Sequence, residues 1–286
     1  MCSISQRTER TLWLTLLSLP DNYWLVMKRY ENIIKSYHED MKQIHSLMTK
    51  LTMNIKGDLE GLFTERTQFS NRLYDLLGSV QYRQNAVEWH LRNLCTQHSQ
   101  FEQNLYKSAF ADSSWYKYDT LNYLFDDFVF NLISLYDYFG SFLYVSFVDP
   151  QKPKKMWSRL ANAAGNKNNE FSNCLLAKEI FQHHREWVIK LNQYRAEVIH
   201  YNLKQGNAKK KISIDNVKGT MKAELQVSLP EDLVKLLSLE ECKQNENGVD
   251  MQFGAIEIVK RSTKGIKKLT QTALTKCTTN SIKFSN

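Results

Sequence analysis

Apolar residues recur every three or four positions along two long stretches in the N-terminal part of the chain. In the first, about residues 21–56, they run from Val26 to Ile55; in the second, about residues 62–106, they run from Phe69 to Leu105. This spacing places apolar side chains on one face of an α-helix. We therefore expect two long amphipathic helices that pair as an antiparallel hairpin.

A third helix is expected over residues 118–147, ending before Asp149-Pro150 because the residue that precedes a proline disfavours helical geometry. Most of its circumference is apolar, but polar residues interrupt the stretch, so a buried bundle helix explains it better than a membrane span. At about 100° per residue, its polar positions form a narrow seam along one side. The seam comprises Asp127, Asn131, Ser134, Asp137 and Ser141.

The C-terminal half changes character after a fourth predicted helix at residues 171–203, which follows a polar connector at residues 151–169. Alternating polar and apolar residues then predict a β-hairpin, and a capping-box sequence predicts a short helix. The expected elements are strands at 211–217 and 221–228, a helix at 232–239, a strand at 250–259 and a basic helix at 262–278. The predicted fold class is mainly α, an up-and-down bundle of long helices with a small C-terminal α+β segment.

We expect three parts along the chain. Residues 1–110 are expected to form the N-terminal helical hairpin, residues 111–206 a helical bundle packed with it, and residues 207–286 a C-terminal extension with a basic tail. The low content of 4 Pro and 10 Gly is compatible with such long helices.

Composition narrows the environment and the partners. The formal net charge of +8 favours phosphate-bearing partners or anionic membrane surfaces. The 5 cysteines are scattered with no close pair, which argues against a disulfide framework and against a zinc site. We therefore expect a cytoplasmic protein without a metal or another cofactor, and without stable membrane insertion.

One segment of the fourth helix carries candidate chemistry: Tyr194-Arg195-Ala196-Glu197-Val198-Ile199-His200-Tyr201-Asn202. A histidine with a pKa near neutrality can take the proton from a ribose 2′-hydroxyl, and a guanidinium can stabilise the charged phosphorane. Arg195 and His200 are therefore the candidate catalytic residues of an RNase that needs no metal and leaves a 2′,3′-cyclic phosphate. Side chains five positions apart diverge by about 140°, so a homodimer that brings two copies of this helix together would gather four such groups.

This segment resembles the R-x(4 to 6)-H element of the HEPN superfamily, the higher-eukaryote and prokaryote nucleotide-binding helical domains. The resemblance covers about residues 119–204. It implies a homodimeric, metal-independent endoribonuclease that cleaves single-stranded RNA, often a toxin with a cognate antitoxin or an effector of phage defence. Many members place Asn, Asp or His directly after the arginine, where this chain has Ala196, so a non-catalytic RNA-binding member stays open.

Other residues are expected to support this segment. Asp137 and Asn131 are candidates to orient Arg195 or His200, because a buried carboxylate needs a partner, and Tyr201 and Asn202 complete the segment. Lysines that follow it or lie in the tail are candidates to track an RNA backbone: Lys209, Lys210, Lys211, Lys264, Lys267 and Lys268. The neighbouring residues His183 and His184 are expected at the surface.

Two wider Arg and His pairs serve as comparisons within the same sequence. Arg92 and His98 are six positions apart and Arg83 and His90 are seven apart. His98 falls on the apolar stripe of the second helix, which predicts a histidine packed inside the hairpin. Two rival interpretations also remain: a helical protein whose long hairpin binds a protein partner, and a membrane-associated helical protein.

Overall fold

The structure is a computed structural model that describes residues 21–57, 63–107, 116–149, 156–200, 208–215, 220–243 and 248–279. The chain divides into a unit that ends at Ser36 and a compact unit from Tyr37 to Asn286. The packing described below is that of the second unit. Its boundaries do not test the three-part division expected near residues 110 and 206, which stays a prediction.

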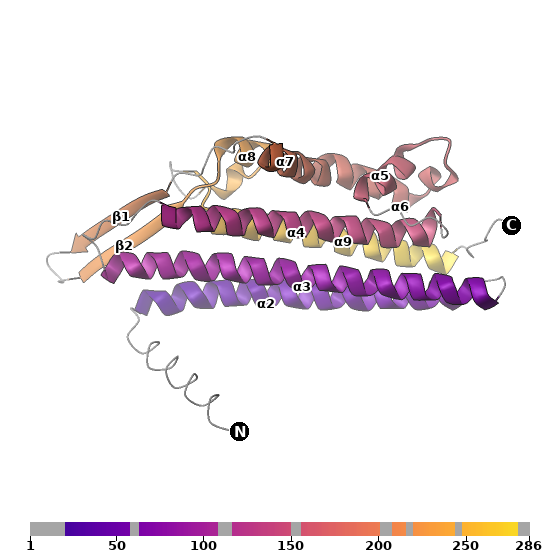
Figure 1. The fold of residues 1–286 in the computed structure, drawn as a ribbon, viewed down its shortest axis with the longest axis horizontal. Helices are drawn as coiled ribbons and strands as arrows, with labels where there is room; N and C mark the ends of the chain where they lie inside the picture. Colours follow the sequence, from indigo (N-terminus) through magenta and orange to yellow (C-terminus); the bar gives the residue numbers. More distant parts are fainter. Residues whose placement is uncertain are drawn as a thin grey trace, which may run out of the picture. The chain divides into compact units, whose positions relative to one another are not determined.

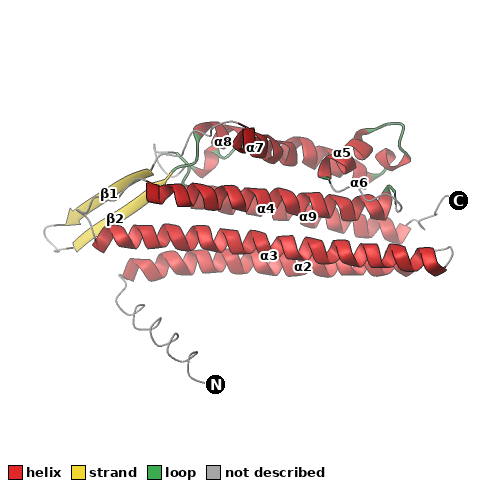
Figure 2. Cartoon of the chain, in the orientation of Figure 1, coloured by secondary structure: helices red, strands yellow, loops and turns green. Residues whose placement is uncertain are grey.

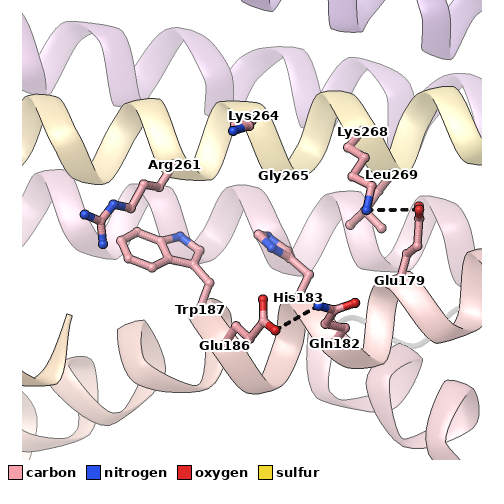
Figure 3. A pocket seen from close by; sticks show the side chains of 10 residues that line it. All are labelled: Glu179, Gln182, His183, Glu186, Trp187, Arg261, Lys264, Gly265, Lys268 and Leu269. Carbon is pink, nitrogen blue, oxygen red and sulfur yellow. Dashed lines mark hydrogen bonds and ion pairs between the residues drawn. The ribbon is translucent and has the colours of Figure 1, made fainter. Parts of the chain in front are cut away.

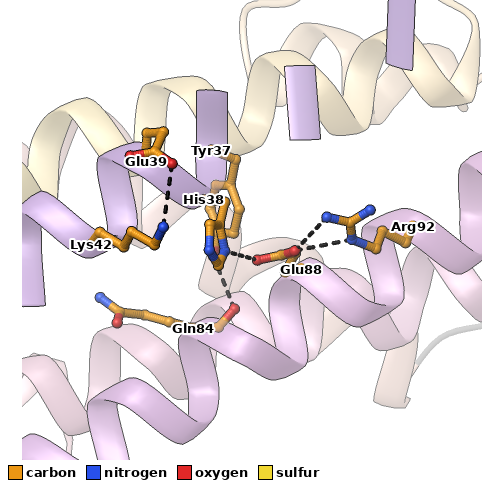
Figure 4. A network of polar contacts seen from close by, with 7 residues as sticks. All are labelled: Tyr37, His38, Glu39, Lys42, Gln84, Glu88 and Arg92. Carbon is orange, nitrogen blue, oxygen red and sulfur yellow. Dashed lines mark hydrogen bonds and ion pairs between the residues drawn. The ribbon is translucent and has the colours of Figure 1, made fainter. Parts of the chain in front are cut away.

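The predicted N-terminal hairpin is confirmed within the second unit. Helix α2 (Asp21–Gly57) and helix α3 (Phe63–Lys107) run antiparallel from Tyr37 onward. Near one end the Tyr37 hydroxyl donates to the Gln84 carbonyl at 3.1 Å, and near the other the Tyr74 hydroxyl contacts Met53 Sδ at 3.6 Å. Figure 4 shows the first of these contacts beside the His38 and Glu88 pair. The side chains facing the seam are fully buried, among them Ile44, Met48, Leu51, Leu73, Val80 and Leu91.

Helix α4 (Tyr116–Phe147) confirms the third predicted helix and lies at the centre of the bundle. It contacts α3 and α9 (Met251–Thr279), and Figure 1 shows the three helices side by side. By length and composition, its part Asp119–Phe147 is the one described helix apolar enough to cross a membrane, and 67% of its most apolar window is buried inside the protein. Phe128, Tyr136, Phe139 and Phe142 on this helix are fully buried.

The connector predicted at residues 151–169 is wrong in part, because α5 (Trp157–Gly165) forms within it. Trp157 is fully buried against α4. Gly140 permits this approach, because a Cβ atom at position 140 would lie 3.0 Å from the Trp157 Cα. Leu160, Ala161 and Ala164 are buried together with Trp157, so a short apolar stripe forms a helix although its polar, Asn-rich flanks predict a loop.

The predicted fourth helix is present but has an irregular course. A short 3-10 helix η1 (Glu170–Asn173) precedes α6 (Leu175–His183), and the π-helical turn η2 (His184–Val188) joins α6 to α7 (Ile189–His200). A π turn inserts an extra residue into a helix and is frequent at functional sites.

The C-terminal α+β segment confirms the hairpin and corrects one strand. Strands β1 (Ala208–Asp215) and β2 (Thr220–Val227) pair antiparallel with Ala208 opposite Val227, and Figure 2 shows the hairpin beside the helices. The short helix α8 (Glu231–Leu236) and the 3-10 helix η3 (Glu240–Cys242) follow.

The strand predicted at residues 250–259 is wrong, because this segment begins α9. Asp250 makes an isolated bridge with Ser228, and its Oδ1 then accepts the Gln252 backbone N–H at 2.9 Å. A carboxylate that accepts an N–H of the first turn starts a helix. The basic helix predicted at residues 262–278 is confirmed as the C-terminal part of α9.

Candidate functional site

Arg195 of α7 lies beside Asp137 of α4. The sequence predicts that this carboxylate orients either Arg195 or His200, and the structure places it next to Arg195. The guanidinium Nη1 is 4.0 Å from Asp137 Oδ2, and the two side chains are 43% and 28% exposed. Two half-exposed groups at this separation form a loose ion pair, so solvent reaches the guanidinium. Arg195 is therefore held near one carboxylate while part of its surface stays open to a ligand.

Asp137 is itself fixed by a second contact. Its Oδ1 accepts the Trp157 backbone N–H at 2.8 Å. That N–H belongs to the first turn of α5, where donors lack an intrahelical partner and the helix dipole favours a negative charge. Burial raises the pKa of Asp137, while the bond from Trp157 and the nearby Arg195 act in the opposite direction. The carboxylate thus links α4, α5 and α7 at one point.

Tyr194 anchors the same turn of α7 in the core. It is 3% exposed, its hydroxyl donates to Asp126 Oδ1 at 2.6 Å, and its ring packs edge-on against Phe125. Burial raises the pKa of Asp126, and the bond from Tyr194 partly offsets this rise. The residue before Arg195 is therefore rigidly held, which limits the positions that the Arg195 backbone can adopt.

Part of the predicted segment lies outside the described residues. His200 is the last residue of α7, but its side chain is outside the described part, as are Tyr201 and Asn202. The backbone of α7 places His200 about 140° around the helix axis from Arg195.

Asn131 is not brought to Arg195. Its Oδ1 accepts Arg83 Nη1 at 3.1 Å, and its amide donates to the Asp127 carbonyl at 2.9 Å. The polar seam of α4 is therefore shared, with Asn131 turned toward α3 and Asp137 toward α5 and α7.

The lysines expected to contact RNA have different surroundings. Lys267 Nζ is 3.0 Å from Asp40 Oδ1 on α2, and Lys268 Nζ is 3.0 Å from Glu179 Oε1 on α6. Lys264 is exposed and has no carboxylate partner among the described residues. Lys209 is exposed on β1, whereas the side chains of Lys210 and Lys211 in the same strand lie outside the described part. Two of the three α9 lysines, Lys267 and Lys268, are therefore paired with carboxylates of other helices.

The comparison pair Arg92 and His98 does not form a common site. Arg92 binds Glu88 Oε1 through Nε and Nη2, at 3.0 and 2.7 Å. His98 is 4% exposed, and its Nε2 lies 3.5 Å from Asp250 Oδ2, at ion-pair distance but outside hydrogen-bonding geometry. The histidine is buried as expected, and the partner comes from the start of α9.

The expectation that His183 and His184 lie at the surface is wrong in part, because both are half-buried and contact buried aromatic side chains. His183 Nε2 is 2.9 Å from the Tyr136 hydroxyl, and His184 Nδ1 accepts the Trp157 indole N–H at 3.2 Å. Burial lowers the pKa of both, that of His183 to about 4. Both histidines lie at the edge of the core, His183 directly before the π turn and His184 at its first position. No pattern in the sequence signals this turn.

Among the described residues, no group of three or more His, Cys, Asp or Glu side chains is arranged to hold a metal ion. The chain was compared with models of known protein families, with curated proteins and with solved structures. None of these comparisons found a match.

Proposed function

We propose that this protein is a metal-independent endoribonuclease of the HEPN type that cleaves single-stranded RNA as a homodimer. Arg195 stabilises the charged phosphorane, and His200 transfers the proton between the ribose 2′-hydroxyl and the leaving oxygen. The proposal implies RNA as substrate, with a toxin or phage-defence role and a cognate antitoxin as further implications. The observation that carries it is the half-exposed Arg195 guanidinium held beside Asp137.

Several features support this assignment. A guanidinium in a loose ion pair can exchange part of that contact for a phosphate, to which it binds in a bidentate manner. Tyr194 and Asp126 anchor the backbone at this position, so little ordering remains to be done when a substrate arrives. Lys209 is exposed, comes nine residues after His200 in the sequence and adds positive charge.

The decisive assay follows cleavage of an end-labelled single-stranded RNA by the purified full chain in EDTA. We expect cleavage that ends in a 2′,3′-cyclic phosphate, detected by mass spectrometry. His200→Ala and Arg195→Ala are each expected to lower the rate by about a hundredfold or more. Matched controls are His38→Ala and Arg185→Ala, which alter an exposed histidine and an exposed arginine outside the segment and should leave the rate unchanged.

A purified wild-type protein that leaves all tested RNAs intact, or cleavage that persists in His200→Ala, would contradict the nuclease assignment. Circular dichroism of each variant establishes that the helices are retained, so that a loss of rate is not a loss of folding.

The alternative is a non-catalytic helical module that binds RNA or a protein. Tyr82 and Trp89 favour it, because they are 67% and 59% exposed and lie seven positions apart on one face of α3. Large exposed aromatic side chains are frequent at binding surfaces. If the protein retains RNA on a filter without cleaving it, the RNA-binding form of this alternative is supported. If the protein neither retains nor cleaves RNA, the protein-binding form is supported.

A further inference from the structure

A cavity of about 370 Å³ lies between α6 with the π turn η2 on one side and α9 on the other. Figure 3 shows the imidazole of His183 and the indole of Trp187 reaching toward α9 across this space. Its volume falls in the range of sites that hold small molecules. Neither Arg195 nor Asp137 lines it, although two of the lysines expected to contact RNA, Lys264 and Lys268, do.

Two local irregularities meet at His183. The π turn begins directly after it, and Gly265 of α9 lies opposite its ring. A Cβ atom at position 265 would lie 2.2 Å from His183 Cε1, so a side chain there would displace the imidazole. A glycine inside a helix lowers its stability, and a π turn does so as well. Both irregularities adjoin one imidazole in the wall of the cavity.

His183 contributes polarity rather than charge. Its Nε2 is engaged by the Tyr136 hydroxyl at 2.9 Å, and no partner for Nδ1 is present among the described residues. Because burial lowers its pKa to about 4, the ring is neutral at neutral pH. One nitrogen of the ring is thus left to donate or accept a hydrogen bond, depending on the tautomer.

Positive charge enters the cavity from α9. Arg261 is held by Glu257 and by the carbonyls of Leu237 and Ser238, and Lys268 is held by Glu179. Lys264 lies between these two on the same wall and has no carboxylate partner among the described residues. Glu179 and Glu186 also line the cavity, so its three cations and two carboxylates leave one net positive charge. Because Lys264 is the cation of this lining without a carboxylate partner among the described residues, the cavity favours a ligand with a negative charge near Lys264.

We propose that this cavity binds a small organic phosphate of about mononucleotide size, with Lys264 contacting the phosphate and His183 hydrogen-bonding the remainder of the ligand. Trp187 and Leu269 supply apolar wall for the body of the ligand. The phosphate belongs either to a free nucleotide or to the phosphorylated end of an RNA. This inference does not rest on the nuclease assignment.

Equilibrium dialysis of the full chain with adenosine 5′-monophosphate tests the proposal, with adenosine as the uncharged probe. We expect saturable binding of the monophosphate and at least tenfold weaker binding of adenosine. Lys264→Glu should weaken binding of the monophosphate at least tenfold. The matched control is Lys260→Glu, which makes the same charge change at an exposed α9 residue outside the cavity and should alter affinity less than twofold.

Further arms separate the sources of the phosphate and the two sites. His183→Gln should weaken binding severalfold, and Arg195→Ala should leave it unchanged even where it abolishes RNA cleavage. A 5′-phosphorylated oligonucleotide that binds in a Lys264-dependent manner, where the free nucleotide does not, identifies an RNA end as the ligand. The proposal would be overturned if neither adenosine 5′-monophosphate nor the 5′-phosphorylated oligonucleotide binds saturably, or if Lys264→Glu and Lys260→Glu weaken binding equally.

Discussion

Asp137 combines two roles in one side chain, because one carboxylate oxygen accepts the Trp157 N–H and the other lies beside Arg195. The first role is structural, since a donor in the first turn of α5 would otherwise be left without a partner in a half-buried position. The second is electrostatic and bears on the proposed chemistry. Substitutions that separate acceptor from charge can therefore distinguish the two.

Asp137→Asn keeps an oxygen that can accept the Trp157 N–H and removes the charge beside Arg195. We expect it to lower the free energy of unfolding by less than about 1 kcal/mol. Asp137→Ala removes the acceptor as well and is expected to cost about 1 to 2 kcal/mol. Urea unfolding followed by circular dichroism measures both values, and equal losses in the two variants would show that the Trp157 contact contributes nothing.

His183 makes stability depend on pH in one direction. Its pKa is about 4 in the folded protein, below the ordinary value of 6.5. As pH falls from about 6.5 to 4, the unfolded chain takes up a proton that the folded chain does not, so stability falls through this window and levels off below it. Nearby Glu186 opposes the shift, whereas Lys268 and His184 add to it after the dominant effect of burial.

We expect this effect to reach at most about 2 to 3 kcal/mol, with partial exposure of the ring reducing it. The measurement is the free energy of unfolding from pH 7 to pH 4 in wild type and in His183→Gln. The raised pKa values of Asp126 and Asp137 act with the opposite sign in both proteins, so only the difference between the two curves is informative. Parallel curves would contradict the assignment to His183.

Helix α9 depends on a close approach that only glycine permits. A Cβ atom at Gly265 would overlap the His183 ring, whereas one at Gly78 in α3 would meet nothing within 4 Å. Both glycines lie inside long helices, so they form a matched pair in which packing alone differs.

Gly265→Ala is expected to lower the free energy of unfolding by about 1 to 3 kcal/mol, because overpacking forces neighbouring groups to shift. Gly78→Ala is expected to raise it by about 0.5 to 1 kcal/mol, because alanine has the higher helix propensity. Thermal unfolding of the two variants measures the difference in sign. A Gly265→Ala protein as stable as Gly78→Ala would mean that the imidazole moves aside without cost.

For the protein as a whole, Arg195 and His200 diverge around α7, so in the proposed homodimer we expect each site to take Arg195 from one chain and His200 from the other. Mixing Arg195→Ala with His200→Ala chains then regenerates one intact site in each mixed dimer. We expect about a quarter of the wild-type cleavage rate from an equal mixture that is unfolded and refolded together, because half of the dimers are mixed. No recovery in the mixture would place the two groups of each site in a single chain.

The long helices could be predicted from residue spacing because each buries one continuous apolar stripe, and such a stripe is visible in the chain order. The hairpin α2–α3 and the buried α4 followed from this spacing, and the strand pair followed from the alternation of polar and apolar residues. The strand predicted at residues 250–259 was wrong because apolar residues over so short a length fit both a strand and a helix. The helix forms there because Asp250 caps the start of α9. Helix α5 was missed because its apolar stripe, from Trp157 to Ala164, is short and lies between polar, Asn-rich flanks.

The candidate site divides in the same way. Arg195 and Asp137 could be proposed as neighbours because a carboxylate on the largely apolar α4 needs a partner, and α7 carries a guanidinium. The cavity beside His183 could not, because it depends on a π turn and on a glycine 82 positions further along the chain. Periodicity records which face of a helix is buried, whereas the meeting of distant residues depends on how whole helices pack. That packing is decided by close contacts summed over the folded protein.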